Sequence, residues 1–277
     1  MRRIVDFGRE VIGKWLRDDA LAQGAALAFY MLFSLTPLLV LVIAVAGLAL
    51  GNDAVQGRVL AQVGEAVGAE AAATVESMIA RMSSPRAGVV ASLASIATML
   101  LGASGVFGHL QAVLNRIFEA PPPAQSGLRH LARRRLSSFG MVLGIGALLG
   151  ASMLLTALLD AFRATLAQYV PALAPALPWL DVGLSIVLSA TLFTLVFRIL
   201  PDVRLVWSDV LLGGAFTAAL FAAGKSLIGL YLARTGGTSV FGAAASLVLL
   251  LLWVYYSAQI LFFGAEVTAV LARRRRG

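Results

Sequence analysis

Hydrophobic residues gather into long runs along the chain, and short polar segments separate these runs. The first run contains no Asp, Glu, Lys or Arg for 33 residues between Asp19 and Asp53. A helix needs about 20 apolar residues to cross the ~30 Å hydrocarbon core of a bilayer, so this run is long enough. Comparable runs follow it. We predict six membrane spans, at about residues 25–50, 88–110, 139–160, 180–200, 209–232 and 243–271.

The spans are expected to be helical, because lipid offers no hydrogen-bond partner to an exposed strand edge. Between the first two spans, valine and isoleucine recur near helical spacing over residues 54–82. This pattern predicts one or two amphipathic helices against the bilayer or the bundle. The predicted fold class is an all-α integral membrane protein: a six-transmembrane-helix bundle with short external amphipathic helices. A single transmembrane domain over 25–271 lies between a cytoplasmic segment, 1–24, and a basic tail, 272–277.

The distribution of Lys and Arg predicts the orientation of the chain. Of 22 such residues, 16 fall in the N-terminal segment, in residues 111–138 and 198–208, and in the C-terminal tail, which a six-span chain places on one side. Five fall on the other side, and Lys225 lies inside a span. Cytoplasmic loops are enriched in Lys and Arg, so both termini are predicted to be cytoplasmic.

Composition excludes several classes of function. The 277 residues are 60% hydrophobic and 13% charged, whereas soluble domains carry about 25% charged residues. The chain has no Cys and two His, which excludes thiol catalysis and leaves no convincing metal cluster. No P-loop motif occurs, so ATP hydrolysis by this chain is not expected. We therefore expect neither an enzyme nor a bound cofactor.

Basic segments lie directly beside two predicted spans. The net charge of +8 would suit nucleic acid, but no folded basic surface with interleaved aromatic residues is expected, so nucleic-acid binding is not predicted. A cation beside a membrane gains about 1 kcal/mol from anionic lipid. Contacts to anionic headgroups on the cytoplasmic side are predicted for Arg133, Arg134, Arg135, Arg273, Arg274, Arg275 and Arg276.

Polar side chains recur at helical spacing within the spans, which predicts faces that look into the bundle. These residues are Tyr30, Ser34 and Pro37 in the first span, His109 in the second, and Tyr255, Gln259 and Glu266 in the sixth. Pro37 lacks a backbone donor and predicts a kink. Such faces serve helix packing in one interpretation and line a solvated cavity in the other.

Two ionisable residues, Lys225 and Glu266, are predicted to lie inside spans. At ~1.5 Å per residue, Lys225 is roughly 24 Å from the cytoplasmic end of its span and Glu266 roughly 8 Å, so no ion pair between them is expected. Lys225 is expected to reach outward or to meet Asp160 or Asp181. Residues expected near the level of Glu266 are Tyr30, His109, Asn115, Arg116, Arg198, Asp202 and Asp209.

A carboxylate buried at that level is costly unless it is paired. We therefore predict that Glu266 meets Arg198, Arg116 or the Tyr30 hydroxyl. These residues would then act as a gate of a cavity open to the cytoplasm, or as a static pair that locks helix ends together.

Several segments resemble the YihY/virulence factor BrkB family of bacterial inner-membrane proteins, which once carried the name ribonuclease BN. The resemblance covers nearly all of the chain. The matching segments are Ala25–Tyr30 with Ser34, Pro37 and Leu38, Leu114–Ile117, Leu200–Val203 with Trp207, and Phe241–Glu266. A tyrosine is common in this family where Phe241 stands. The resemblance implies a multi-pass, six-helix protein of the bacterial inner (plasma) membrane, and transport of lipids or envelope precursors is among the functions suggested for such proteins.

The leading functional hypothesis is a transporter, or a protein that handles lipids or envelope precursors, with a polar cavity inside the bundle. The alternative is a membrane scaffold that recruits envelope partners through its basic loop and external helices. Membrane lipids are the expected partners, together with an envelope protein or a second copy of the chain. A nuclease is not expected, because it would need clustered His and carboxylate ligands.

Overall fold

The computed structural model describes residues 2–32, 34, 43, 51–67, 69–82, 105–121, 177–235 and 245–276. Its bounded helices are α1 (Arg2–Arg17), α3 (Asn52–Val67), α4 (Ala69–Met82), α7 (Leu177–Ile199), α8 (Trp207–Thr235) and α9 (Ala245–Arg276). Further helices cover Ala20–Leu32 and residues 105–117. In the described part of the chain all regular structure is helical, as predicted.

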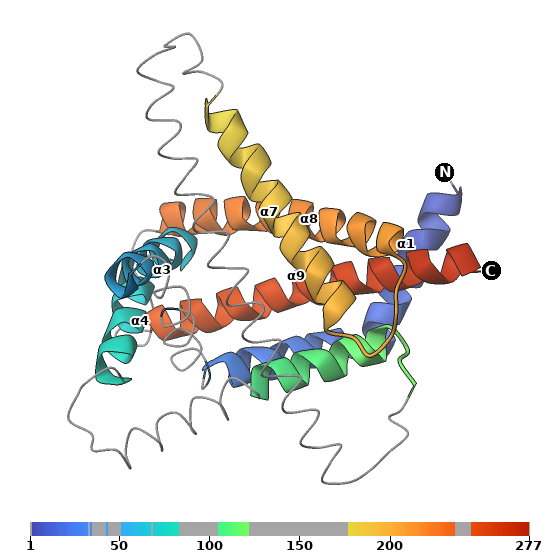
Figure 1. The fold of residues 1–277 in the computed structure, drawn as a ribbon, viewed down its shortest axis with the longest axis horizontal. Helices are drawn as coiled ribbons and strands as arrows, with labels where there is room; N and C mark the ends of the chain where they lie inside the picture. The colour runs from blue at the N-terminus through green and yellow to red at the C-terminus, as the bar shows by residue number, and fades with distance from the viewer. Residues whose placement is uncertain are drawn as a thin grey trace.

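The two long helices α8 and α9 lie side by side and run in opposite directions (Figure 1). Within the described residues, they contain the two segments that are long and apolar enough to cross a membrane, Trp207–Ser226 and Val248–Arg275. Helix α7 packs against α8 and overlaps the predicted fourth span. The number of six spans stays a prediction, since residues 139–160 lie outside the described part of the chain.

Helices α8 and α9 approach closely, because glycines on each helix face threonines on the other. A Cβ atom at Gly213 would overlap Thr268, and one at Gly264 would overlap Thr217. Each threonine hydroxyl donates within its own helix, Thr217 to the Gly213 carbonyl at 2.6 Å and Thr268 to the Gly264 carbonyl at 2.7 Å. The hydroxyls are therefore satisfied while the side chains fill the space above the opposite glycines. Small residues permit this kind of packing in lipid.

The helices α3 and α4 lie at the end of the α8–α9 pair that is opposite to the chain termini (Figure 1). Their buried side chains are Val55, Val59, Val75 and Ile79, which pack with Leu250 of α9. The amphipathic helices predicted within residues 54–82 are therefore confirmed, with these valine and isoleucine side chains on the buried face. The external location of these helices stays a prediction.

Helix α1 crosses the other end of α9, near the C-terminus (Figure 1). Val11 of α1 packs there with Val267 and Val270. A larger apolar cluster joins the helices over Ala20–Leu32 and 105–117 to α7, α8 and α9. The crossing of α1 and α9 thus brings an N-terminal segment against the end of the helix bundle, and the candidate site lies at this crossing.

Candidate functional site

Lys14, near the end of α1, is the centre of a cluster of charged side chains. Its Nζ atom lies 2.6 Å from Oδ2 of Asp18, 3.3 Å from Oε2 of Glu266 and 3.9 Å from Oε1 of Glu119. It also donates a hydrogen bond of 2.8 Å to the backbone carbonyl of Ile117. Lys14 therefore ties α1 both to α9 and to the end of the helix over residues 105–117.

The local sequence of α1 explains why Lys14 is held against α9. Val11, Lys14 and Trp15 are spaced three and four residues apart, which places them on one face of a helix. Val11 packs on α9, and the Trp15 ring meets Phe263 edge to face with centroids 6.5 Å apart. With apolar contacts on both sides, the Lys14 side chain is only 6% exposed.

Glu266 of α9 is fully buried, at 0% exposure. Neither of its carboxylate oxygens accepts a hydrogen bond from the residues that the structure describes. Lys14 meets it as an ion pair at 3.3 Å, which is longer than the roughly 2.8 Å of a charge-assisted hydrogen bond. The carboxylate thus has an opposite charge beside it and unused capacity to accept hydrogen bonds.

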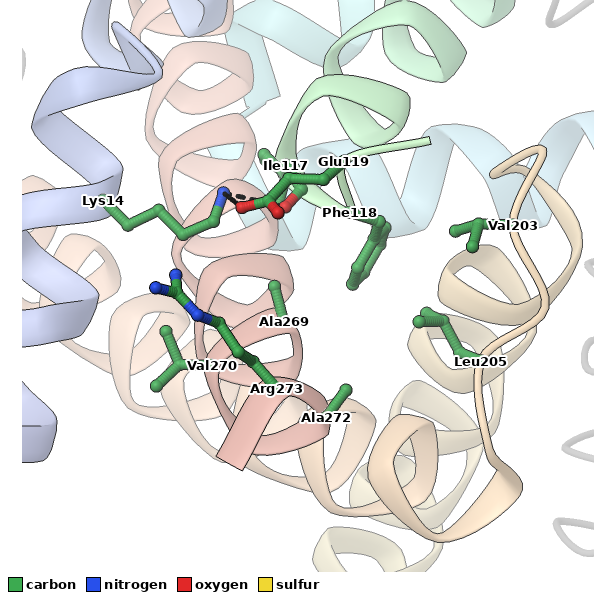
Figure 2. A pocket seen from close by; sticks show the side chains of 10 residues that line it. All are labelled: Lys14, Ile117, Phe118, Glu119, Val203, Leu205, Ala269, Val270, Ala272 and Arg273. Carbon is green, nitrogen blue, oxygen red and sulfur yellow. Dashed lines mark hydrogen bonds and ion pairs between the residues drawn. The ribbon is translucent and has the colours of Figure 1, made fainter. Parts of the chain in front are cut away.

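A pocket of about 160 Å³ opens beside Lys14. Figure 2 shows the charged side chains of Lys14, Glu119 and Arg273 along one side and the apolar side chains of Val203 and Leu205 across from them. The described residues that line it are Lys14, Ile117, Phe118, Glu119, Val203, Leu205, Ala269, Val270, Ala272 and Arg273. The site therefore offers both charged and apolar walls at one end of the bundle.

The loop that carries Val203 and Leu205 is fastened to the helix over residues 105–117. The Asn115 amide donates to Asp202 Oδ2 at 2.6 Å, and the Asp202 backbone N–H donates back to Asn115 Oδ1 at 2.7 Å. Gln111 adds a bond of 3.2 Å to Asp202 Oδ1. This two-way contact fixes the apolar wall of the pocket relative to the charged one.

The comparison with known proteins agrees with this helical membrane architecture. The family model for virulence factor BrkB matches residues 11–277 of the chain. The chain belongs to the virulence factor BrkB family. It is similar to proteins named as UPF0761 membrane proteins, and it is itself a membrane protein.

Three such relatives illustrate the similarity to this BrkB family member. The protein from Rhodospirillum centenum is 30% identical over 275 residues, which cover 97% of this chain and 58% of the relative. Those from Pseudomonas aeruginosa and Azotobacter vinelandii are 26% and 29% identical, each over 98% of this chain and 64% of the relative. The chain thus spans about three-fifths of the length of these relatives. No solved structure matches it.

The prediction that Glu266 of this BrkB protein meets Arg198, Arg116 or the Tyr30 hydroxyl is wrong. Its partner is Lys14, which the sequence placed in a cytoplasmic segment before the first span. Depth estimates compared residues on the spans with one another. They could not show that α1 packs across α9 and places Lys14, a residue outside the spans, beside Glu266.

The residues first proposed as partners of Glu266 have other contacts. Arg198 stacks over the Trp207 ring, 5.1 Å from its centroid, and donates to the Leu205 carbonyl. Arg116 is exposed. The rings of Tyr30 and His109 have centroids 5.1 Å apart. The polar residues predicted at the membrane level of Glu266 therefore form several separate contacts.

Three more predicted residues make local contacts. Two of them, on α9, lie against the helix over Ala20–Leu32, and the third bonds within its own helix. Gln259 donates to the Ala20 carbonyl at 3.2 Å, and a Cβ at Gly24 would overlap the Gln259 amide and contact Tyr255. The Ser34 hydroxyl donates to the carbonyl of Tyr30 in its own helix. These contacts serve helix packing.

Two arginines of the basic tail form ion pairs with acidic side chains of the protein. Arg274 lies 2.8 Å from Oε2 of Glu10, and Arg275 lies 2.7 Å from Oδ1 of Asp209. Asp209, which was predicted to lie near the membrane level of Glu266, pairs with the tail. Contacts of the tail to lipid remain a prediction.

The remaining predicted residues are Lys225 and a group that lies wholly or in part outside the described residues. Lys225 is exposed on α8. Pro37, Arg133, Arg134, Arg135 and Asp160 lie outside the described residues, as do the side chains of Asp181 and Arg276. The kink predicted at Pro37 and the lipid contacts predicted for these arginines stay predictions.

Proposed function

We propose that this BrkB-family membrane protein moves or positions lipids or envelope precursors, without a chemical step and without a cofactor. The observation that carries the proposal is the ion pair between Lys14 and Glu266 beside a pocket with charged and apolar walls. Ionisable residues within membrane helices are rare and commonly mark substrate or ion pathways. An amphipathic substrate needs both kinds of wall.

Energetics favour this proposal over a purely structural role for the pair. Removing an ion from water costs several kcal/mol, so apolar residues of similar size stabilise a buried contact as well as an ion pair or better. Val11, Val267 and Val270 already hold α1 on α9 in this way. A charged pair beside them therefore costs desolvation energy that a purely structural contact does not require.

The unused acceptor capacity of Glu266 gives a second argument. A carboxylate that serves only to fasten helices is expected to have its oxygens satisfied by hydrogen bonds. Among the described residues, none donates a hydrogen bond to Glu266. The carboxylate therefore keeps acceptor capacity that the contacts between the helices do not use, beside the pocket residue Lys14.

The test is reconstitution of the chain into liposomes that contain fluorescently labelled phospholipids. We expect movement of labelled lipid above that in protein-free vesicles, and loss of this movement in a Lys14→Met/Glu266→Leu double variant that still folds. The matched control is Glu76→Gln, an exposed carboxylate on α4. Absence of movement by the unaltered chain, over a panel of phospholipids and envelope precursors, would contradict the proposal.

A further inference from the structure

The pocket beside Lys14 lies where two candidate membrane spans end. One span begins at Trp207, two residues after the pocket residue Leu205, and the other runs to Arg275, two residues beyond Arg273. Trp207 is 53% exposed and carries the Arg198 guanidinium on its ring. Exposed Trp is typical of membrane–water interfaces. The pocket is therefore at the level of lipid headgroups.

The size of the pocket sets the size of its ligand. A volume of about 160 Å³ is smaller than the roughly 300–1,000 Å³ of pockets that enclose drug-sized molecules. It suits a headgroup but cannot enclose a whole lipid. Val206 and Leu211, beside the pocket loop and on the first turns of α8, are more than half exposed and offer an apolar surface to acyl chains.

The charges of the pocket select among headgroups. Lys14 is surrounded by the carboxylates of Asp18, Glu119 and Glu266, so its positive charge is already balanced. Arg273 has no carboxylate partner in the described part of the chain, and the Glu119 side chain is 68% exposed. These five groups carry three negative and two positive charges. A ligand with an ammonium group as well as a phosphate is therefore favoured over a purely anionic one.

We propose that this pocket binds the phosphoethanolamine group of a zwitterionic phospholipid, with the phosphate at Arg273 and the ammonium at Glu119. The proposal rests on the proposed lipid-handling function and names the headgroup that the site accepts. The same chemistry is present in soluble glycerophosphoethanolamine, which lacks acyl chains. The two sources differ in whether the exposed apolar surface near Leu211 contributes to binding.

The test measures binding of phosphatidylethanolamine and phosphatidylglycerol, with equal acyl chains, to the purified chain in detergent by native mass spectrometry. We expect a preference of about fivefold for phosphatidylethanolamine, as one partly exposed charge contact allows. Glu119→Gln should remove this preference, and Arg273→Gln should weaken binding of both lipids. Glu76→Gln and Arg17→Gln are matched controls at exposed positions outside the pocket lining and should change neither.

Equal affinity of the unaltered chain for the two lipids, or an unchanged preference in Glu119→Gln, would overturn the assignment. Soluble glycerophosphoethanolamine should compete with the lipid; if it does so at equal concentration, the headgroup chemistry stands and a soluble ligand is the source. Lipid movement in liposomes is measured in parallel. Movement without a headgroup preference overturns only the pocket assignment, whereas selective binding without movement overturns only the proposed function.

Discussion

Lys14 of α1 and Glu266 of α9 come from opposite ends of the chain, and their Nζ and Oε2 atoms lie 3.3 Å apart. Because the Glu266 carboxylate is fully buried, this contact decides whether its charge is compensated. Lys14 is also held by Asp18 at 2.6 Å. Glu266 therefore depends on Lys14 for charge compensation more than Lys14 depends on Glu266. Single substitutions of the two residues should reveal this difference.

Substitution of Lys14 by Met should destabilise the protein more than substitution of Glu266 by Leu. Loss of Lys14 leaves Glu266 as an unpaired buried charge, which costs about 3–5 kcal/mol. Loss of Glu266 leaves Lys14 paired with Asp18, so the cost should be smaller. Thermal unfolding in detergent measures this order, and a larger loss of stability in Glu266→Leu would contradict it.

The double variant Lys14→Met/Glu266→Leu should be more stable than Lys14→Met alone, because it removes the unpaired carboxylate. The coupling between residues in contact is of the order of 0.5–3 kcal/mol. The same unfolding measurement on the two single variants and the double variant gives this coupling energy. Strictly additive effects would show that the two side chains act independently.

Substitution of Gly264 by Ala should separate α8 from α9, because the added Cβ would overlap Thr217. Overpacking of this kind costs about 1–3 kcal/mol. Gly108→Ala is the matched control, since a Cβ there meets no atom of the described residues within 4 Å. The control should be neutral or stabilising, as Ala is the better helix former. Equal melting temperatures for the two variants would argue against the close contact.

The loop before α8 should loosen when Asn115 is replaced by Ala. This change removes both hydrogen bonds between Asn115 and Asp202. The cost should be about 1 kcal/mol, because the bonds are solvent-exposed. Amide hydrogen exchange over residues 200–206 should rise while exchange in α3 and α4 stays unchanged. Uniform exchange changes across the chain would instead indicate global destabilisation.

The sequence alone was sufficient to predict the helices whose apolar residues follow a strong local pattern. The spacing of valine and isoleucine in residues 54–82 predicted the buried face of α3 and α4, as Val55 and Ile79 show. The long apolar runs predicted helices where α8 and α9 lie. These features depend on local periodicity, which a single sequence displays.

The partner of Glu266 could not be read from the spans, because the cation comes from outside them. The available signal was the spacing of Phe7, Val11 and Trp15, which marks one apolar face in the N-terminal segment. Lys14 lies beside that face, so the segment could have been recognised as a helix that packs on the bundle. Its basic residues were instead interpreted only as a sign of orientation.

The measurement that tests the central claim most directly compares Glu266→Gln with the unaltered protein for abundance in detergent and for lipid movement in liposomes. Gln keeps the shape of the side chain and removes its charge. If the Lys14–Glu266 pair serves function, Glu266→Gln should be recovered in normal amount, whereas its lipid movement should fall to that of protein-free vesicles. Normal lipid movement by Glu266→Gln would contradict the account.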